Sequence, residues 1–89
     1  MFLHIGENVI IRKKDIIAII DKETINDSKD TNKFIQNMIE NGYLYTKNNE
    51  NIKTYIITCI KKRDSKNRQY AKEYRLYTSN ISSTALSNR

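Results

Sequence analysis

Two clusters of basic residues are the strongest chemical signal in the sequence. The first is Arg12-Lys13-Lys14, and the second comprises Lys61, Lys62, Arg63, Lys66 and Arg68. Guanidinium and ammonium groups on such segments can follow a phosphate backbone, because they displace its condensed counterions. Three tyrosines beyond the second cluster could stack on bases or donate hydrogen bonds to phosphate: Tyr70, Tyr74 and Tyr77. The pattern indicates contact with nucleic acid, and a merely solvated loop is the alternative.

Residues suited to catalysis or metal binding are scarce. His4 and Cys59 are the only histidine and cysteine, and neither has a second soft ligand nearby for a zinc site. We expect His4 to be half-buried in a strand and Cys59 to be a buried, inert thiol. With only Gly6 and Gly42, a Gly-rich phosphate loop is excluded. Three carboxylates could still converge in space: Glu7, Asp15 and Asp21. The sequence predicts a protein that is not an enzyme, with no metal, no cofactor and no evident small-molecule ligand.

The net charge of +6 is unevenly distributed. Residues 1–21 are neutral and residues 22–50 sum to −1, whereas residues 51–89 carry nine Lys or Arg against Asp64 and Glu73. Lys, Asn and Ile fill 37 of the 89 positions, as in low-GC genomes, so basicity alone is weak support. Such a bias would not concentrate the charge in one segment, however.

The length of 89 residues allows a single domain, residues 1–89. A domain of this size without a disulfide has little core to stabilise it, so we expect a homo-oligomer. The longest wholly apolar run, residues 16–20, is far shorter than a membrane span. Residues 1–7 lack the features of a signal peptide, so we expect no membrane partner and a cytoplasmic location.

The N-terminal half predicts strands and one main helix. Residues 2–5 and 8–11 suit two strands across a tight turn, and residues 16–20 read as a strand buried on both faces. Two polar turns, at residues 21–24 and 26–28, are expected next. The next apolar residues have helical spacing and form one stripe: Phe34, Ile35, Met38 and Ile39. This helix would be capped by Ser28 or Asp30 and ended by Gly42.

The C-terminal half predicts a hairpin. Residues 43–46 could form a short strand, and residues 53–60 and 72–78 two longer ones joined by a basic tip at residues 61–69. Residues 79–89 allow one or two helical turns. The fold class is therefore α+β: a mainly antiparallel sheet of five or six short strands, one central helix and a short C-terminal helix.

Both ends of the sequence resemble a known family. Residues 2–21, FLHIGENVIIRKKDIIAIID, are similar to the opening of RemB-type members of the RemA/RemB family of small bacterial biofilm-matrix regulators. Residues 77–86, in the order Y-x-S-x-I-S-S-x-x-L, are similar to that family's serine-rich ending. Residues 24–55 agree in their pattern of helix then strand more than in residue identity.

The resemblance implies a DNA-binding regulator that forms a ring-like homo-oligomer from a subunit with a fold similar to LytTR DNA-binding domains. The family's DNA-contacting arginines match Arg12, Lys13 or Lys14, and Lys53 in this sequence. Because lysine cannot make a planar bidentate contact, we expect phosphate contacts and groove shape to outweigh base readout. The hairpin is longer and more basic than the family pattern, and Asn80 replaces a frequent proline.

These observations predict an oligomeric regulator of extracellular-matrix genes that binds duplex DNA. The basic residues of neighbouring subunits would then converge on one surface and act by avidity. The alternative is a homo-oligomeric protein–protein adaptor that does not bind DNA and whose charge serves solubility or an acidic partner.

Overall fold

An antiparallel sheet of three strands, in the order β3–β4–β5, lies at the centre of the computed structural model, which describes residues 1–46, 51–63 and 70–89. A separate two-stranded antiparallel sheet is formed by β1 and β2. The strands are β1 (Phe2–His4), β2 (Ile10–Arg12), β3 (Ile16–Asp21), β4 (Thr54–Arg63) and β5 (Tyr70–Ser79). The α+β class is confirmed. The strands of the described residues are divided between two sheets, however, and do not form the single sheet of five or six strands that the sequence predicts.

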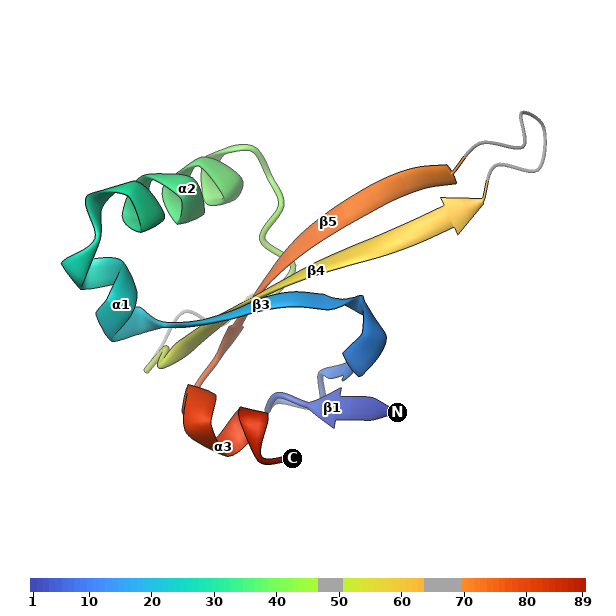
Figure 1. Cartoon of the computed structure of the whole chain (residues 1–89), viewed down its shortest axis with the longest axis horizontal. Coiled ribbons are helices and arrows are strands. Elements are labelled where there is room, and N and C mark those ends of the chain that lie inside the picture. The colour runs from blue at the N-terminus through green and yellow to red at the C-terminus, as the bar shows by residue number, and fades with distance from the viewer. Residues whose placement is uncertain (47–50, 64–69) are drawn as a thin grey trace.

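Two helices cover one face of the central sheet, and the small sheet and a third helix cover the other (Figure 1). The helical elements are a 3-10 turn, η1 (Lys13–Asp15), and the helices α1 (Lys22–Asp27), α2 (Lys29–Glu40) and α3 (Ser83–Ser87). Helices α1 and α2 lie on one side of the sheet, whereas β1, β2 and α3 lie on the other. None of the helices in the described ranges has the length and apolar character needed to cross a bilayer.

Strand β4 supplies both hydrophobic cores, because its successive side chains point to opposite faces. Ile56 packs with the core under the β1–β2 sheet and α3, and Ile57 packs with the core under α1 and α2. Thr58, on the Ile56 face, is fully buried. This alternation is the one that the sequence predicts for residues 53–60.

Helix α2 begins and ends at the residues that the sequence indicates. The Ser28 hydroxyl accepts a hydrogen bond from the Thr31 N–H at 3.3 Å, and Gly42 adopts a φ of 81° after the last turn. The Gly42 N–H donates to the Ile39 carbonyl and the Tyr43 N–H to the Met38 carbonyl. These two hydrogen bonds satisfy carbonyls that have no partner within the helix at its C-terminal end.

The segment before α2 is helical, although the sequence predicts two polar turns there. Helix α1 spans Lys22–Asp27 and buries a single side chain, Ile25, in the core shared with α2. The prediction was wrong because one buried residue in six produces no helical periodicity. Tertiary packing of Ile25 decides the conformation.

Strand β3 is an edge strand whose apolar side chains pack on both faces but are only partly buried, so the prediction of burial on both faces holds in part. It pairs with β4 on one side, and no described strand pairs with its other side. The register shifts between Ile16 and Ala18, and Ile17 at this irregularity is 58% exposed. Its remaining apolar side chains divide between the two cores.

Strands β4 and β5 continue beyond β3 as a two-stranded arm (Figure 1). Strand β3 ends its pairing at Thr58, whereas β4 remains paired with β5 out to Arg63 and Tyr70. Both strands are longer than predicted, so Lys61 and Lys62 lie in β4 and not in a loop. Residues 43–46 form no strand, and only Leu44 makes a parallel bridge, to Leu76.

Candidate nucleic-acid interface

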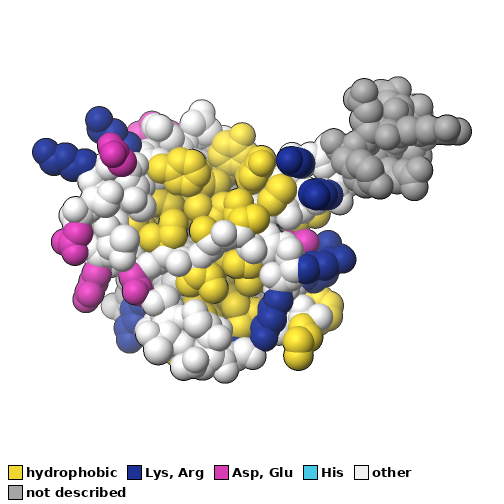
Figure 2. Space-filling view, viewed as in Figure 1, with side chains coloured by type: hydrophobic (Ala, Val, Ile, Leu, Met, Phe, Trp, Pro, Cys, Tyr) yellow, Lys and Arg dark blue, Asp and Glu magenta, His cyan; other side chains and the backbone are white. Residues whose placement is uncertain are grey.

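Basic residues are frequent in η1 and in the parts of β2, β4 and β5 that lie nearest to it, with Lys62 and Arg75 on one face of the arm and Lys61 and Lys72 on the other. We call this group the cationic end: Arg12, Lys13, Lys14, Lys61, Lys62, Lys72 and Arg75. Two carboxylates, Asp15 and Glu73, accompany these seven cations. Figure 2 shows mainly Lys and Arg along this side of the molecule, whereas the opposite side carries Asp and Glu interspersed with Lys and Arg. The positive excess therefore lies on the side of the cationic end.

The strand register brings η1 close to the arm. Ile16, which follows η1, pairs with Thr58, and Lys61 pairs with Lys72. Strand residues rise about 3.4 Å each, so Lys61 lies only ~10 Å along β4 from Thr58. The first predicted cluster and the start of the second are therefore neighbours.

Four of these cations are already engaged within the chain. Arg12 Nε donates to Asp15 Oδ2 at 2.9 Å, and Lys13 Nζ donates to the Arg89 carbonyl at 2.7 Å. Lys62 Nζ and Arg75 contact Glu73 Oε2 at 3.0 and 3.2 Å. The other three form no ion pair with a described residue: Lys14, Lys61 and Lys72. These three lysines are the best placed to meet an external anion.

Glu73 and Arg75 reinforce each other's charged states. The hydrogen bond from Lys62 is the main cause that lowers the pKa of Glu73 below its ordinary value, and the charge of Arg75 adds to it. The hydrogen bond from Arg75 to the Tyr77 hydroxyl is the main cause that raises the pKa of Arg75. Glu73 therefore stays anionic near neutral pH, and the base of the arm keeps a positive balance.

Lys53 lies apart from this group. Its N–H donates to the Ser79 carbonyl and its carbonyl accepts from the Lys22 N–H, which places it at the end of the sheet near α1. Along β4 it is ~17 Å from Thr58, in the direction opposite to Lys61. One subunit does not bring Lys53 together with the cationic end. Their convergence between neighbouring subunits stays a prediction.

The remaining predicted contacts are only partly described. Lys66 and Arg68 lie outside the described residues, and for Arg63 only the place of the backbone at the end of β4 is described. Sequence reasoning missed Lys72 and Arg75 because they are dispersed through β5. The available signal was that the predicted hairpin places residues 72–75 on the strand that pairs with the basic end of β4.

The tyrosines differ in what they can contact. Tyr77 is 5% exposed and belongs to the core, so its ring cannot stack on a base. Tyr74 is exposed on the arm. Tyr45, which was not among the predicted contacts, is also exposed, and the Arg75 guanidinium lies 4.5 Å from its ring centroid. Among the described side chains, Tyr74 and Tyr45 are exposed rings near the cationic end, and the side chain of Tyr70 lies outside what the structure describes.

The residues considered for catalysis do not assemble. His4 is exposed, not half-buried, and Cys59 is partly exposed, not buried. Asp15 and Asp21 lie at opposite ends of β3. Within the described ranges, no group of three His, Cys, Asp or Glu side chains could hold a metal ion.

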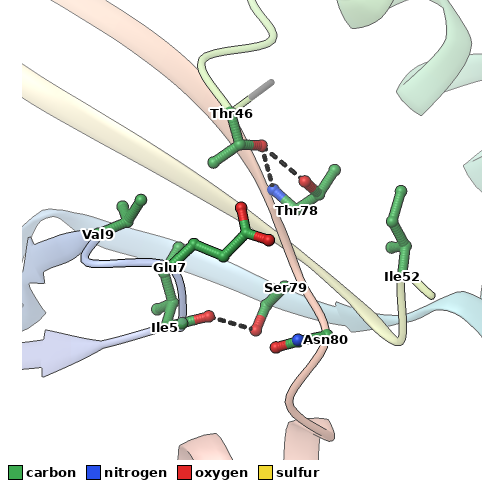
Figure 3. A pocket seen from close by; sticks show the side chains of 9 residues that line it. Ile5, Glu7, Val9, Thr46, Ile52, Thr78, Ser79 and Asn80 are labelled. Carbon is green, nitrogen blue, oxygen red and sulfur yellow. Dashed lines mark hydrogen bonds between the residues drawn. The ribbon is translucent and has the colours of Figure 1, made fainter. Parts of the chain in front are cut away.

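A small hollow beside the β1–β2 turn is lined by hydroxyl groups (Figure 3). The Thr46 and Thr78 hydroxyls lie 2.6 Å apart, and the Ser79 hydroxyl donates to the Ile5 carbonyl at 2.7 Å. The hollow has about 20 Å³ of space, which suffices for a water molecule but not for a larger ligand.

Comparison with known proteins supports the resemblance. The model of the RemA-like family, described as extracellular matrix regulatory protein A-like, matches residues 2–64. The matched range includes η1 and the whole of β4, and it does not distinguish the RemB-type branch. No curated protein matches the sequence.

Proposed function

The chain belongs to the RemA-like family of extracellular matrix regulatory proteins, and from this premise we propose that it regulates matrix genes by binding duplex DNA as a homo-oligomer. The observation that carries the proposal is the cationic end, where seven basic residues of neighbouring segments, on both faces of the β4–β5 arm, are accompanied by two carboxylates. DNA phosphates are the partner that such a surface fits best.

The chemistry of the cationic end favours phosphate contacts over base readout. The cations that form no ion pair with a described residue are lysines, which act as point charges. Its arginines, Arg12 and Arg75, are held by Asp15 and Glu73. Binding would therefore depend strongly on salt and only weakly on base sequence.

Oligomerisation is supported by the edge of the sheet. Strand β3 presents an edge that no described strand covers and that carries the exposed Ile17, and such an edge can pair with another chain. A second copy would double the phosphate contacts along one DNA and add avidity. Pairing with a second copy would also bring Lys53 of one subunit toward the cationic end of the other.

The test compares two triple variants with the same change of charge. Replacing Lys14, Lys61 and Lys72 with Ala should weaken binding of a fluorescent duplex about 10- to 100-fold, and lower the salt slope by about 0.9 for each phosphate that the variant no longer neutralises. The matched control replaces Lys22, Lys29 and Lys33, on α1 and α2, with Ala, and should bind nearly as the parent does. Equally weakened binding in both variants, or an affinity independent of salt, would contradict the proposal.

Lys53 needs its own variant, because it lies at the other end of the sheet. Lys53→Ala should weaken DNA binding only if subunits place Lys53 beside a neighbour's cationic end. Light scattering on the same samples checks that the oligomer is intact. Unchanged affinity with an intact oligomer would remove Lys53 from the interface.

The adaptor function is the second candidate, and the open edge of β3 favours it because assembly needs no DNA. Size-exclusion chromatography with light scattering, with and without duplex DNA, separates the two functions. An oligomer that never co-elutes with DNA at low salt supports the adaptor.

A further inference from the structure

A cleft separates the β2–η1 segment from the face of the β4–β5 sheet, and we propose that it binds a small organic anion: a carboxylate on an apolar body of about the size of one six-membered ring. The cleft has a volume of about 160 Å³. We call it the η1 cleft. The proposal does not depend on DNA binding, although the cleft shares Arg12 and Arg75 with the cationic end.

The buried wall of the η1 cleft holds a hydroxyl with no partner among the described residues. Thr58 is 0% exposed, and its Oγ1 atom makes no hydrogen bond with any of them. Buried polar groups in folded proteins are nearly always hydrogen-bonded, because leaving one unsatisfied costs free energy. An unsatisfied hydroxyl in the wall of an open cleft points to a ligand that would form the missing hydrogen bond.

The polar groups beside Thr58 on the sheet are donors, whereas the Asp15 carboxylate lines the η1 side of the cleft and is paired with Arg12. Arg75 lies directly opposite Thr58 in the β4–β5 register, and Tyr77 follows on the same face. The Tyr77 hydroxyl accepts a hydrogen bond from Arg75 at 3.4 Å, so its own O–H can still donate. Two hydroxyls and a guanidinium therefore converge. A group that only accepts hydrogen bonds and carries negative charge, such as a carboxylate, complements them.

The remaining walls are apolar. Ile10, Ile11 and Ile60 line the η1 cleft, and Ile10 is 62% exposed at its mouth. Cavities of roughly 150 Å³ lined by such side chains accommodate benzene. The volume and the walls therefore favour a ligand with an apolar body over a bare inorganic anion.

Charged groups at and near the cleft determine which sign of charge a ligand should carry. Arg12 pairs with Asp15, and Arg75 pairs with Glu73, which Lys62 also contacts. Two cations and one carboxylate line the cleft, and Lys62 and Glu73 adjoin Arg75 outside its lining. The Arg75 side chain lines the cleft, and its guanidinium also lies 4.5 Å from the Tyr45 ring centroid. The balance favours an anion, and the competing carboxylates imply weak binding.

The test uses benzoate as the probe and nuclear magnetic resonance of the labelled full-length chain as the readout. Benzoate should shift the signals of Thr58, Ile10 and Ile60 in a saturable way. Benzyl alcohol, which has the same ring without the charge, should bind at least about tenfold more weakly because it lacks a charge-assisted hydrogen bond. Inorganic phosphate should shift signals near the arginines without shifting the isoleucine methyl groups.

Thr58→Val is the decisive variant, because valine keeps the shape of threonine and removes only the unpartnered hydroxyl. It should fold at least as stably as the parent and bind benzoate several-fold more weakly. Thr84→Val, on the exposed surface of α3, is the matched control and should leave benzoate binding unchanged.

Three results would overturn the proposal: shifts that do not saturate, equal binding of benzyl alcohol, or unchanged benzoate affinity in Thr58→Val. Saturable phosphate binding that displaces benzoate from the isoleucine walls would also overturn it, in favour of a simple anion site. None of these experiments contains DNA, so their failure leaves the proposed regulatory function standing.

Discussion

Lys61 on β4 lies directly opposite Lys72 on β5. Like charges at directly opposed positions of an antiparallel pair destabilise the pairing. Neither side chain forms an ion pair with a described residue. The arm therefore holds a repulsive pair that an external anion would relieve.

Lys72→Glu should reveal this conflict between stability and binding. The variant converts the repulsive pair into an attractive one, so amide hydrogen exchange along the arm should slow, while affinity for duplex DNA should fall at low salt. Lys33→Glu, on the exposed surface of α2, changes the net charge equally and should leave exchange in the arm unchanged. Tighter DNA binding by Lys72→Glu would remove Lys72 from the interface.

Gly6→Ala should destabilise the chain by about 2 kcal/mol or more. Gly6 has a φ of 103°, and a Cβ atom there would lie 3.0 Å from Asn80 Oδ1. Gly42→Ala is the matched control, because Gly42 also has a positive φ, 81°, but open space around it. It should cost only about 1 kcal/mol. Urea unfolding measures both, and an equal loss of stability in the two variants would contradict a role for the Asn80 contact.

The pKa of Glu73 should rise when Lys62 is removed. The hydrogen bond from Lys62 is the main cause that holds this pKa below its ordinary value of 4.5, so Lys62→Ala should shift the titration of the Glu73 carboxyl upward. Lys61→Ala removes the neighbouring lysine, whose side chain points to the opposite face of the arm, and should leave the titration nearly unchanged. Carbon-detected magnetic resonance across acidic pH follows the Glu73 carboxyl directly.

The sign of the pH dependence follows from the lowered pKa. A carboxyl whose pKa is lower in the folded chain than in the unfolded chain stabilises the fold above the unfolded value. That contribution is lost as the pH falls from about the ordinary value, 4.5, through the folded pKa. The parent should therefore lose more stability than Lys62→Ala across this acidic range. A larger loss of stability in the variant would contradict the Lys62–Glu73 contact.

The sequence predicted those elements that are determined by residues close together in the chain. The stripe of Ile35, Met38 and their neighbours predicted α2, and Gly42 predicted its end. Alternation predicted the two faces of β4. The terminal turn was also predicted, and Ser82 caps it by accepting from the Ala85 N–H. In each case the signal lies within one segment of the chain.

Features that depend on distant segments were not predicted. The apolar character of β3 resembles that of a strand buried on both faces, and only topology reveals that it is an edge strand. The η1 cleft needs Arg12 from β2 and Thr58 and Arg75 from the hairpin, residues that no spacing in the sequence relates. The separation of Lys53 from η1 likewise follows from antiparallel pairing.

The edge of β3 offers a test of assembly that is independent of DNA. Ile17 is 58% exposed at the register shift of β3, and in a chain this small an apolar side chain on an edge that no described strand covers favours pairing with another copy. Ile17→Lys places a charge on that edge, so it should dissociate the proposed oligomer, as measured by light scattering, with little change in the circular dichroism of the subunit. Phe34→Lys is the matched control, because Phe34 is similarly exposed on α2, away from the edge. If Ile17→Lys keeps the parent's mass, the subunits assemble through another surface, and the route that brings Lys53 near a neighbour's cationic end must be sought there.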